Sequence, residues 1–203
     1  MNWHDANLKV YDNNAEGLAT YYRGFGPRSE DIQRGISLSK KGADSVVVEI
    51  GCGDGRDATE ITKRVKSYIG VDPSEGLLSV ARNDLPEASF VLADALSYDY
   101  PQNIDIIFAF ASLLHVNKDD LSLVFKKIHT SLNPEGILYI ALKESSAYKE
   151  EIKSDAYGQR MFYYYNPEII REMAGDGFEV VYEDHQVAAG DTRWFTMGMR
   201  KKS

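Results

Sequence analysis

Residues 46–55, with the sequence VVVEIGCGDG, constrain the fold more than any other part of this chain. A run of β-branched apolar residues is typical of a strand that is buried on both faces of a parallel sheet. Glycines follow at positions 51, 53 and 55, and a backbone without Cβ atoms allows a ligand to approach closely. Apolar residues then recur at helical spacing over 56–65, so the loop leads into a helix whose free N–H groups attract an anion. The sequence therefore predicts the strand, loop and helix of a ligand-binding site.

The glycine spacing distinguishes two classes of cofactor. A dinucleotide-binding loop has the pattern G-x-G-x-x-G, with its third glycine where the helix packs on the strand. Arg56 occupies that position here, and the observed pattern is E-x-G-x-G-x-G, starting at Glu49. This spacing disfavours a nicotinamide cofactor. The glycines by themselves could also form an ordinary turn that binds no ligand.

An acid ends the next strand candidate. Residues 67–72, SYIGVD, are mostly apolar up to Asp72, which is followed by Pro73. At about this interval after a glycine loop, an acid commonly accepts hydrogen bonds from ribose hydroxyls. The alternative is that Asp72 begins a turn and caps a helix over 74–83.

A third strand candidate, residues 88–96, contains Asp94 and Ala95. With Glu49, the three glycines, Asp72 and Asp94 in this order, the chain resembles the class I S-adenosylmethionine-dependent methyltransferases over about residues 45–200. The resemblance implies that Asp72 holds the ribose of S-adenosylmethionine, that Asp94 and the next amide contact its adenine, and that S-adenosylhomocysteine is the product. The cofactor-binding residues that it implies are Glu49, Gly51, Cys52, Gly53, Gly55, Asp72, Pro73, Asp94, Ala95 and Phe110.

Strand and helix candidates alternate from 46 to 177, so a parallel sheet with right-handed crossovers is expected. Residues 178–184 and 193–201, joined by a polar loop, predict a closing hairpin. The resemblance implies the rest of this α/β fold: a Rossmann-like, seven-stranded, mostly parallel sheet in the order 3-2-1-4-5-7-6, with strand 7 antiparallel and helices on both faces. The other predicted elements are strands from 104 towards 116 and over 136–144, and helices that begin near Ser29, after Asn117, and at Asn166 with Pro167.

The composition fits one domain. Of the 203 residues, 43% are hydrophobic, which is enough for a full core in a single domain over 1–203. We expect a Rossmann-like core over 45–200. The resemblance implies that residues 1–44 form an N-terminal helical lid over the cofactor, and an amphipathic helix at the edge of the sheet is the alternative.

Charge and cysteine content narrow the partners. The net charge is −8 and Lys and Arg are scattered, which disfavours a nucleic-acid partner. The single cysteine, Cys52, excludes a disulfide within one chain, and the first residues lack the apolar core of a signal peptide. No apolar run reaches membrane-spanning length. We therefore expect a cytoplasmic protein without a nucleic-acid or membrane partner, and leave monomer and homodimer open.

Two tyrosine-rich segments are candidates for an acceptor pocket. The first contains Tyr11 and Tyr22, and the second, within a long connection over 145–166, contains Arg160 and Tyr163. Long connections are often binding loops, whereas a strand with alternately buried and exposed tyrosines is the other interpretation. A further candidate, in the loop of the closing hairpin, is His185.

Candidate catalytic residues follow from the chemistry. A sulfonium methyl group is already electrophilic, so its transfer depends mainly on holding the acceptor in line and excluding water. A phenol, thiol or protonated amine would also need a base within hydrogen-bond reach. The candidates are His115 and Glu144, with Lys143 as another, and the alternative for His115 is a hydrogen bond to a backbone carbonyl. No His, Cys and carboxylate cluster has metal-ligand spacing, so no metal is expected.

Three functions stay open. The leading one is methyl transfer from S-adenosylmethionine to a small-molecule acceptor. The chain lacks the Asn-Pro-Pro-Tyr or Asp-Pro-Pro-Tyr motif of enzymes that methylate the amino groups of nucleic-acid bases. It also lacks the Pro-Cys pair that would supply a nucleophile for methylation of cytosine at C5. The second is a regulatory protein that binds S-adenosylmethionine or S-adenosylhomocysteine without turnover. The third is a nicotinamide-dependent oxidoreductase, which Arg56 disfavours. The acceptor and the atom that is methylated are open as well.

Overall fold

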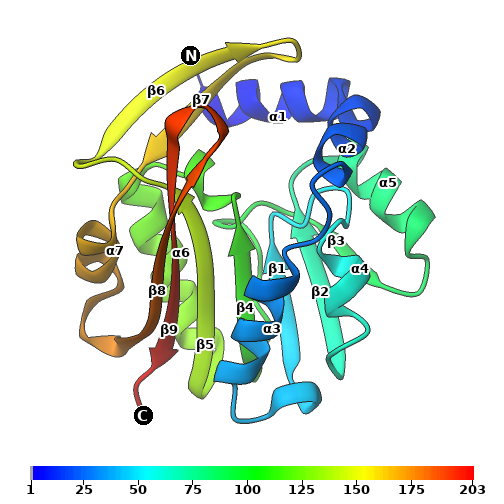
Figure 1. Ribbon diagram of the computed structural model, residues 1–203. Coiled ribbons are helices and arrows are strands. Elements are labelled where there is room, and N and C mark those ends of the chain that lie inside the picture. The colour runs from blue at the N-terminus through cyan, green and yellow to red at the C-terminus, as the bar shows by residue number, and fades with distance from the viewer. Residues whose placement is uncertain (1) are drawn as a thin grey trace.

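The computed structural model describes residues 2–203, which form an α/β fold around a seven-stranded sheet (Figure 1). The strands of this sheet are β1 (Val46–Ile50), β2 (Ser67–Asp72), β3 (Ser89–Leu92), β4 (Ile104–Phe110), β5 (Leu132–Lys143), β8 (Phe178–Ala188) and β9 (Thr192–Lys201). Their order is β3-β2-β1-β4-β5-β9-β8, with the first five parallel and β9 antiparallel to both neighbours. Because β8 and β9 are the sixth and seventh strands of this sheet along the chain, the predicted order is confirmed.

Helices cover both faces of this sheet. The helices are α1 (Trp3–Asn13), α2 (Ala15–Arg23), α3 (Ser29–Leu38), α4 (Ala58–Ile61), α5 (Glu75–Asp84), α6 (Lys118–Ser131) and α7 (Pro167–Ala174). Apolar residues of α3 and α4 pack with Val47 in one core, and those of α6 and α7 pack with Val48 in the other. Successive side chains of β1 thus enter opposite cores, as expected for a doubly covered strand. Among the described residues, no helix combines the length and apolar character needed to cross a lipid bilayer.

Side-chain caps begin the helices at the predicted positions. The Asn117 side chain accepts a hydrogen bond from the Asp120 amide at 3.0 Å, and Asn166 accepts one from the Ile169 amide at 2.9 Å. Pro167 occupies the first turn of α7, where its missing N–H costs nothing. These contacts satisfy amides that have no partner within the helix, which explains why the starts of α6 and α7 were predictable.

Two elements near the glycine loop are shorter than predicted. The helix expected over 56–65 forms only over the four residues of α4, and turns follow it. Just before α4, the Arg56 guanidinium pairs with Asp57 at 2.5 Å, and Asp57 also accepts from the Arg28 amide at 2.7 Å. The third strand ends at Leu92, so Asp94 lies in the loop after the strand and not on it.

The closing hairpin is longer than predicted. Strand β8 continues to Ala188, which pairs with Thr192 of β9, so most of the expected polar loop is strand. The turn is tight because Gly190 and Asp191 adopt left-handed φ angles of 72° and 57°. As a result, His185 lies on an edge strand of the sheet.

The connection over 145–166 is a β-hairpin and not an irregular loop. Strands β6 (Lys149–Asp155) and β7 (Gly158–Tyr164) pair in antiparallel fashion as a separate two-stranded sheet. The expected alternation of buried and exposed tyrosines is wrong, because every residue from Met161 to Tyr165 is buried. Neighbouring side chains cover these rings: Tyr148 stacks on Tyr163, and lysine side chains of β6 lie over Tyr164.

This hairpin and α1 lie over the carboxyl ends of the parallel strands (Figure 1). They are joined by Asn7, whose side-chain amide donates to the Met161 carbonyl at 2.9 Å and accepts from the Met161 amide at 2.8 Å. Asn7 is 5% exposed and takes the place of a neighbouring strand on the edge of β7. The N-terminal segment is therefore helical and sits above the edge of the sheet where ligands bind in such folds.

Candidate functional site

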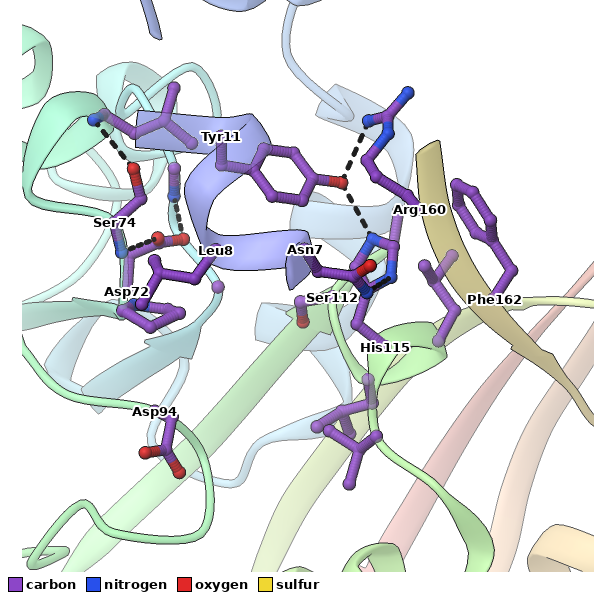
Figure 2. A pocket seen from close by; sticks show the side chains of 18 of the residues that line it. Asn7, Leu8, Tyr11, Asp72, Ser74, Asp94, Ser112, His115, Arg160 and Phe162 are labelled. Carbon is purple, nitrogen blue, oxygen red and sulfur yellow. Dashed lines mark hydrogen bonds between the residues drawn. The ribbon is translucent and has the colours of Figure 1, made fainter. Parts of the chain in front are cut away.

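A cavity of about 1210 Å³ lies between the carboxyl ends of the strands and the cover formed by α1 and the β6–β7 hairpin. One end is lined by the glycine loop and by residues that follow β2 and β3. The other end is lined by α1, the turn after β4 and the hairpin (Figure 2). The sequence-predicted residues that line it are Tyr11, Tyr22, Gly51, Cys52, Gly53, Asp72, Pro73, Asp94, Ala95, Phe110, His115, Arg160 and Tyr163.

The glycines of the loop serve different purposes. Gly51 and Gly53 have left-handed φ angles of 72° and 54°, which side chains disfavour. A Cβ atom on Gly51 would lie 2.1 Å from the Cβ of Ser112, so this glycine allows the loop to pack against the end of β4. Around Gly53 the nearest atom, Cδ1 of Leu77, would be 3.8 Å away, so its bare backbone faces open space on the cavity side.

Asp72 lies at the carboxyl end of β2, beside this loop. Its two carboxylate oxygens accept hydrogen bonds from the amides of Gly53 and Ser74, both at 2.9 Å. Each oxygen keeps a further lone pair for a ligand hydroxyl. Burial raises the pKa of Asp72 to about 6, and the two amide hydrogen bonds hold it from rising further. The helix cap considered for Asp72 is instead made by Ser74, whose hydroxyl accepts from the Leu77 amide at 3.2 Å.

Asp94 shapes the loop after β3 as well as lining the cavity. Its carboxylate accepts from the amides of Leu96 and Ser97 at 2.8 and 2.9 Å and from the Ser97 hydroxyl at 2.6 Å. Burial alone would raise the pKa of Asp94, but these hydrogen bonds outweigh burial and lower it. The carboxylate is therefore ionised and held in place, with Ala95 next to it on the cavity wall.

Glu49 and Gly55 lie beneath the cavity, in contrast to the expectation for the cofactor site. Glu49 is 2% exposed and accepts a hydrogen bond from the Tyr68 hydroxyl at 2.5 Å. Burial, together with the nearby Asp57, raises the pKa of Glu49 well above its ordinary value. Alternation along β1 explains the placement, because Glu49 faces the same side as Val47. Gly55 packs on α5, where an added Cβ atom would lie 3.2 Å from Ala81.

A hydrogen-bonded chain of side chains crosses the other end of the cavity. The Arg160 guanidinium donates to the hydroxyls of Tyr11 and Tyr22 at 3.2 and 3.3 Å and also pairs with Asp155. The Tyr11 hydroxyl lies 2.7 Å from Nε2 of His115 (Figure 2). Three predicted pocket residues, Tyr11, Tyr22 and Arg160, are thus brought together with one catalytic candidate.

The partners of His115 determine its tautomer. Its Nδ1 lies 2.8 Å from the carbonyl oxygen of Met161 and 3.1 Å from the side-chain nitrogen of Asn7. The shorter contact is to the carbonyl, which can only accept, so we assign the proton to Nδ1, and Nε2 accepts from Tyr11. Burial lowers the pKa of His115 to about 4, and the nearby Arg160 and Lys143 contribute to the shift. The imidazole is therefore neutral at physiological pH, and the backbone contact considered from sequence is present.

Glu144 and His185 lie outside the cavity, in contrast to the expectation that they form part of the acceptor site. His185 Nδ1 is 3.2 Å from the Glu144 carboxylate, and the His185 side chain is exposed on β8. The hydrogen bond to Glu144 raises the pKa of His185 despite a small opposing effect of burial. The reason for the difference is the extension of β8, which moves His185 from a loop to the outer strand of the sheet.

Other residues line the cavity that the sequence did not single out. Asp54 is 5% exposed and accepts from Nε of Arg23 at 2.7 Å, which ties α2 to the glycine loop. The only sequence signal of Asp54 is its position after the first glycines. Lys143, which the sequence did offer as a catalytic candidate, also lines the cavity, and its ammonium lies 3.9 Å from the centre of the Phe162 ring. Further polar and aromatic residues of the lining include Trp3, Asn7, Asp57, Lys153, Asp155, Phe162 and Trp194.

Comparisons with known proteins agree with this geometry. Residues 47–136 match a family model described as a methyltransferase domain. Trans-aconitate 2-methyltransferase of Escherichia coli is 32% identical over 101 residues, which are 49% of this chain and 39% of that protein. The chain thus spans less than half the length of the curated relatives it matches.

Solved structures share the fold at low sequence identity. A SAM-dependent methyltransferase of Leishmania major has a TM-score of 0.75 at 16% identity, with 97% of this chain and 82% of that chain covered. The 1,6-didemethyltoxoflavin-N1-methyltransferase of Burkholderia thailandensis, with 1,6-didemethyltoxoflavin and S-adenosylhomocysteine bound, has a TM-score of 0.72 at 17% identity, with 100% and 92% covered. The comparisons thus show a methyltransferase domain over residues 47–136, and a fold shared with solved S-adenosylmethionine-dependent methyltransferases.

Proposed function

We propose that this chain transfers the methyl group of S-adenosylmethionine to a small-molecule acceptor. The observation that carries the proposal is a single cavity with the glycine loop and Asp72 at one end and the Arg160–Tyr11–His115 chain at the other. The names of the relatives point the same way, since trans-aconitate and 1,6-didemethyltoxoflavin are small molecules.

The cofactor end has the features that S-adenosylmethionine requires. Gly53 leaves open space where its backbone faces the cavity, and both oxygens of Asp72 keep lone pairs. Asp72 would accept hydrogen bonds from the ribose hydroxyls, and Asp94 with the Ala95 amide would contact the adenine. Gly51, Cys52, Pro73 and Phe110 would complete the wall around the rest of the molecule. Glu49 and Gly55 would support the loop from below.

When bound, S-adenosylmethionine supplies an electrophilic methyl group on its sulfonium sulfur. The chain's own residues would hold the acceptor behind this methyl group and exclude water, which is the main requirement for an in-line displacement. Helix α1 and the β6–β7 hairpin cover the cavity and would form the barrier to solvent. Tyr11, Tyr22, Tyr163 and Arg160 would line the acceptor, whereas Glu144 and His185 lie too far out to take part.

His115 would act mainly by position. Its Nε2 is occupied by the Tyr11 hydroxyl, and its neutral form is a weak base because its pKa is about 4. It would hold Tyr11 and the β7 backbone in place, and it could receive a proton only through Tyr11. A positioned, already deprotonated acceptor would therefore suit this site best.

We further propose that residues 1–203 act as one domain, with 1–44 as the lid, in the cytoplasm and as a monomer or homodimer. A net charge of −8 supports a small molecule over a nucleic acid as the partner. The chain has a single cysteine, Cys52, which is buried, and the lack of a cysteine pair for a disulfide within one chain fits a reducing compartment.

The test is methyl transfer from methyl-labelled S-adenosylmethionine to a panel of carboxylic acids, phenols, thiols and amines. We expect label in at least one compound with the wild type and none with Gly53→Val, which fills the open side of the loop. Gly42→Val is the matched control, because Gly42 also has a left-handed φ, of 51°, and lies away from the cavity. Binding of S-adenosylhomocysteine without transfer to any compound would instead favour a regulatory protein, and binding of a nicotinamide cofactor would favour an oxidoreductase.

A further inference from the structure

Cationic side chains gather around one aromatic ring at the acceptor end of the cavity. The Lys143 ammonium lies 3.9 Å and the Arg160 guanidinium carbon 5.6 Å from the centre of the Phe162 ring. Lys143 extends from the end of β5 and Arg160 from β7, so two separate elements bring the charges together. All three side chains line the cavity.

The carboxylates near these cations are already paired. Asp155 pairs with Arg160, and Glu151 lies 3.1 Å from Lys149 and 3.5 Å from Lys153. Among residues 2–203, no ion pair or hydrogen bond is made by the Lys143 ammonium. Burial lowers the pKa of Lys143 to about 8, and repulsion from Lys153 and Arg160 adds to this. The chain itself therefore leaves one partly buried cation without a counter-charge.

Arg160 has unused bonding capacity as well. It is 6% exposed, and its terminal nitrogens donate to Tyr11, Tyr22 and Asp155. Its Nε is buried and has no hydrogen-bond partner among the described residues. A buried donor without a partner is costly, so this nitrogen calls for an explanation such as a functional role, a water molecule or an ion.

We propose that the acceptor carries a carboxylate that binds between Lys143 and Arg160. The proposal rests on the proposed function, because it assigns a chemical class to the acceptor of the same cavity. A carboxylate would give Lys143 its missing counter-charge, and the Arg160 guanidinium would add a second positive charge beside it. Phe162 and Trp194, which lies 5.8 Å from the Lys143 ammonium, would contact the apolar body of the molecule.

Matched pairs of acid and amide test this inference without knowledge of the natural acceptor. The wild type is first titrated with S-adenosylhomocysteine, and the loaded protein is then titrated with benzoate and benzamide, fumarate and fumaramide, and succinate and succinamide. We expect at least one acid to bind about tenfold or more tightly than its amide, the difference typical of a charge-assisted hydrogen bond. No preference for an acid in any pair would overturn the proposal.

Variants locate the effect. Lys143→Met should remove the acid preference, and Lys143→Arg should restore most of it because the charge returns without a removable proton. Lys149→Met is the matched control, since Lys149 is an exposed lysine on β6 that does not line the cavity. An acid preference that survives Lys143→Met, or that is lost equally in Lys149→Met, would overturn the proposal.

The two proposals fail in different measurements. If S-adenosylhomocysteine does not bind but Lys143-dependent binding of acids is seen, the methyltransferase proposal fails and the carboxylate site stands. If S-adenosylhomocysteine binds but acids and amides bind alike, the carboxylate site fails and the methyltransferase proposal stands. Phosphate monoesters that bind in place of every acid would also contradict a carboxylate-bearing acceptor.

Discussion

The Tyr11 hydroxyl donates a hydrogen bond of 2.7 Å to Nε2 of His115 and so joins α1 to the turn that follows β4. The opposite ring nitrogen donates to Met161 in β7, and Asn7 of α1 binds the same backbone. Three segments far apart in the sequence thus meet at one neutral imidazole. This arrangement closes the cavity over the carboxyl ends of the strands, and it can be tested through Tyr11 and His115.

Removal of the Tyr11 hydroxyl should loosen the cover of the cavity. Tyr11→Phe leaves His115 Nε2 without a donor and removes an acceptor from Arg160, so we expect a loss of about 1 to 2 kcal/mol in the free energy of unfolding. Hydrogen exchange should accelerate in residues 3–13. Tyr21→Phe is the control, because Tyr21 is 54% exposed. Unchanged stability and exchange in Tyr11→Phe would contradict the proposed role of this contact.

His115 should make stability depend on pH in a defined direction. Its pKa falls from an ordinary value of about 6.5 in the unfolded chain to about 4 in the folded protein, so the folded protein binds fewer protons between these values. The stability that the neutral imidazole contributes is complete above about pH 6.5 and is lost as the pH falls towards 4.

The measurement is urea unfolding at about pH 7 and about pH 5. The wild type should lose about 1 to 2 kcal/mol more than His115→Gln over this interval. Asp72 has the opposite effect, because its raised pKa favours folding as the pH falls. Asp72 is present in both proteins, so its effect cancels when their losses of stability are compared. His4→Gln, at an exposed position of α1, is the control. Equal losses in the wild type and His115→Gln would show that the imidazole is not held neutral.

Asp72 should contribute directly to cofactor affinity. Asp72→Ala removes both carboxylate oxygens that are available to the ribose, so we expect affinity for S-adenosylhomocysteine to fall by about 1 to 3 kcal/mol. Asp99→Ala is the control, since Asp99 is an exposed acid in the loop after β3. Calorimetric titration provides both affinities. A Kd that is unchanged in Asp72→Ala would refute the ribose assignment.

The first two glycines of the loop should respond differently to a single added methyl group. Gly53→Ala incurs mainly the strain of a left-handed φ, about 1 to 2 kcal/mol, because its new Cβ atom would have space. Gly51→Ala adds an overlap with Ser112 at 2.1 Å and should cost clearly more. Thermal or urea unfolding compares the two variants. A Gly51→Ala protein as stable as Gly53→Ala would mean that the packing of the loop against β4 is misassigned.

The strands and the glycine loop were predictable because their signals are local, whereas the order of the strands came from the resemblance to a known family. A continuous apolar run, positive-φ glycines after it, and capping residues such as Asn117 each act within a few residues of the structure they specify. The parallel direction of these strands then follows from their β-α-β connections, whose crossovers have one hand. Asp72 and Asp94 reach the cavity for the same reason, since the ends of parallel strands share one edge.

The rest depends on contacts between distant segments. No local pattern shows that Asn7 completes the edge of β7, or that Tyr11 meets His115 across 104 positions of sequence. Glu49 was expected at the cofactor, but strand alternation turns it into the core beneath the loop. His185 was expected in a loop, and the tight turn at Gly190 places it on β8 instead.

The most direct test of the account is calorimetric titration of the wild-type protein with S-adenosylhomocysteine, with NADH as the comparison ligand. The account predicts saturable binding of S-adenosylhomocysteine at one site per chain and no binding of NADH. Absence of S-adenosylhomocysteine binding, or saturable binding of NADH in its place, would contradict it.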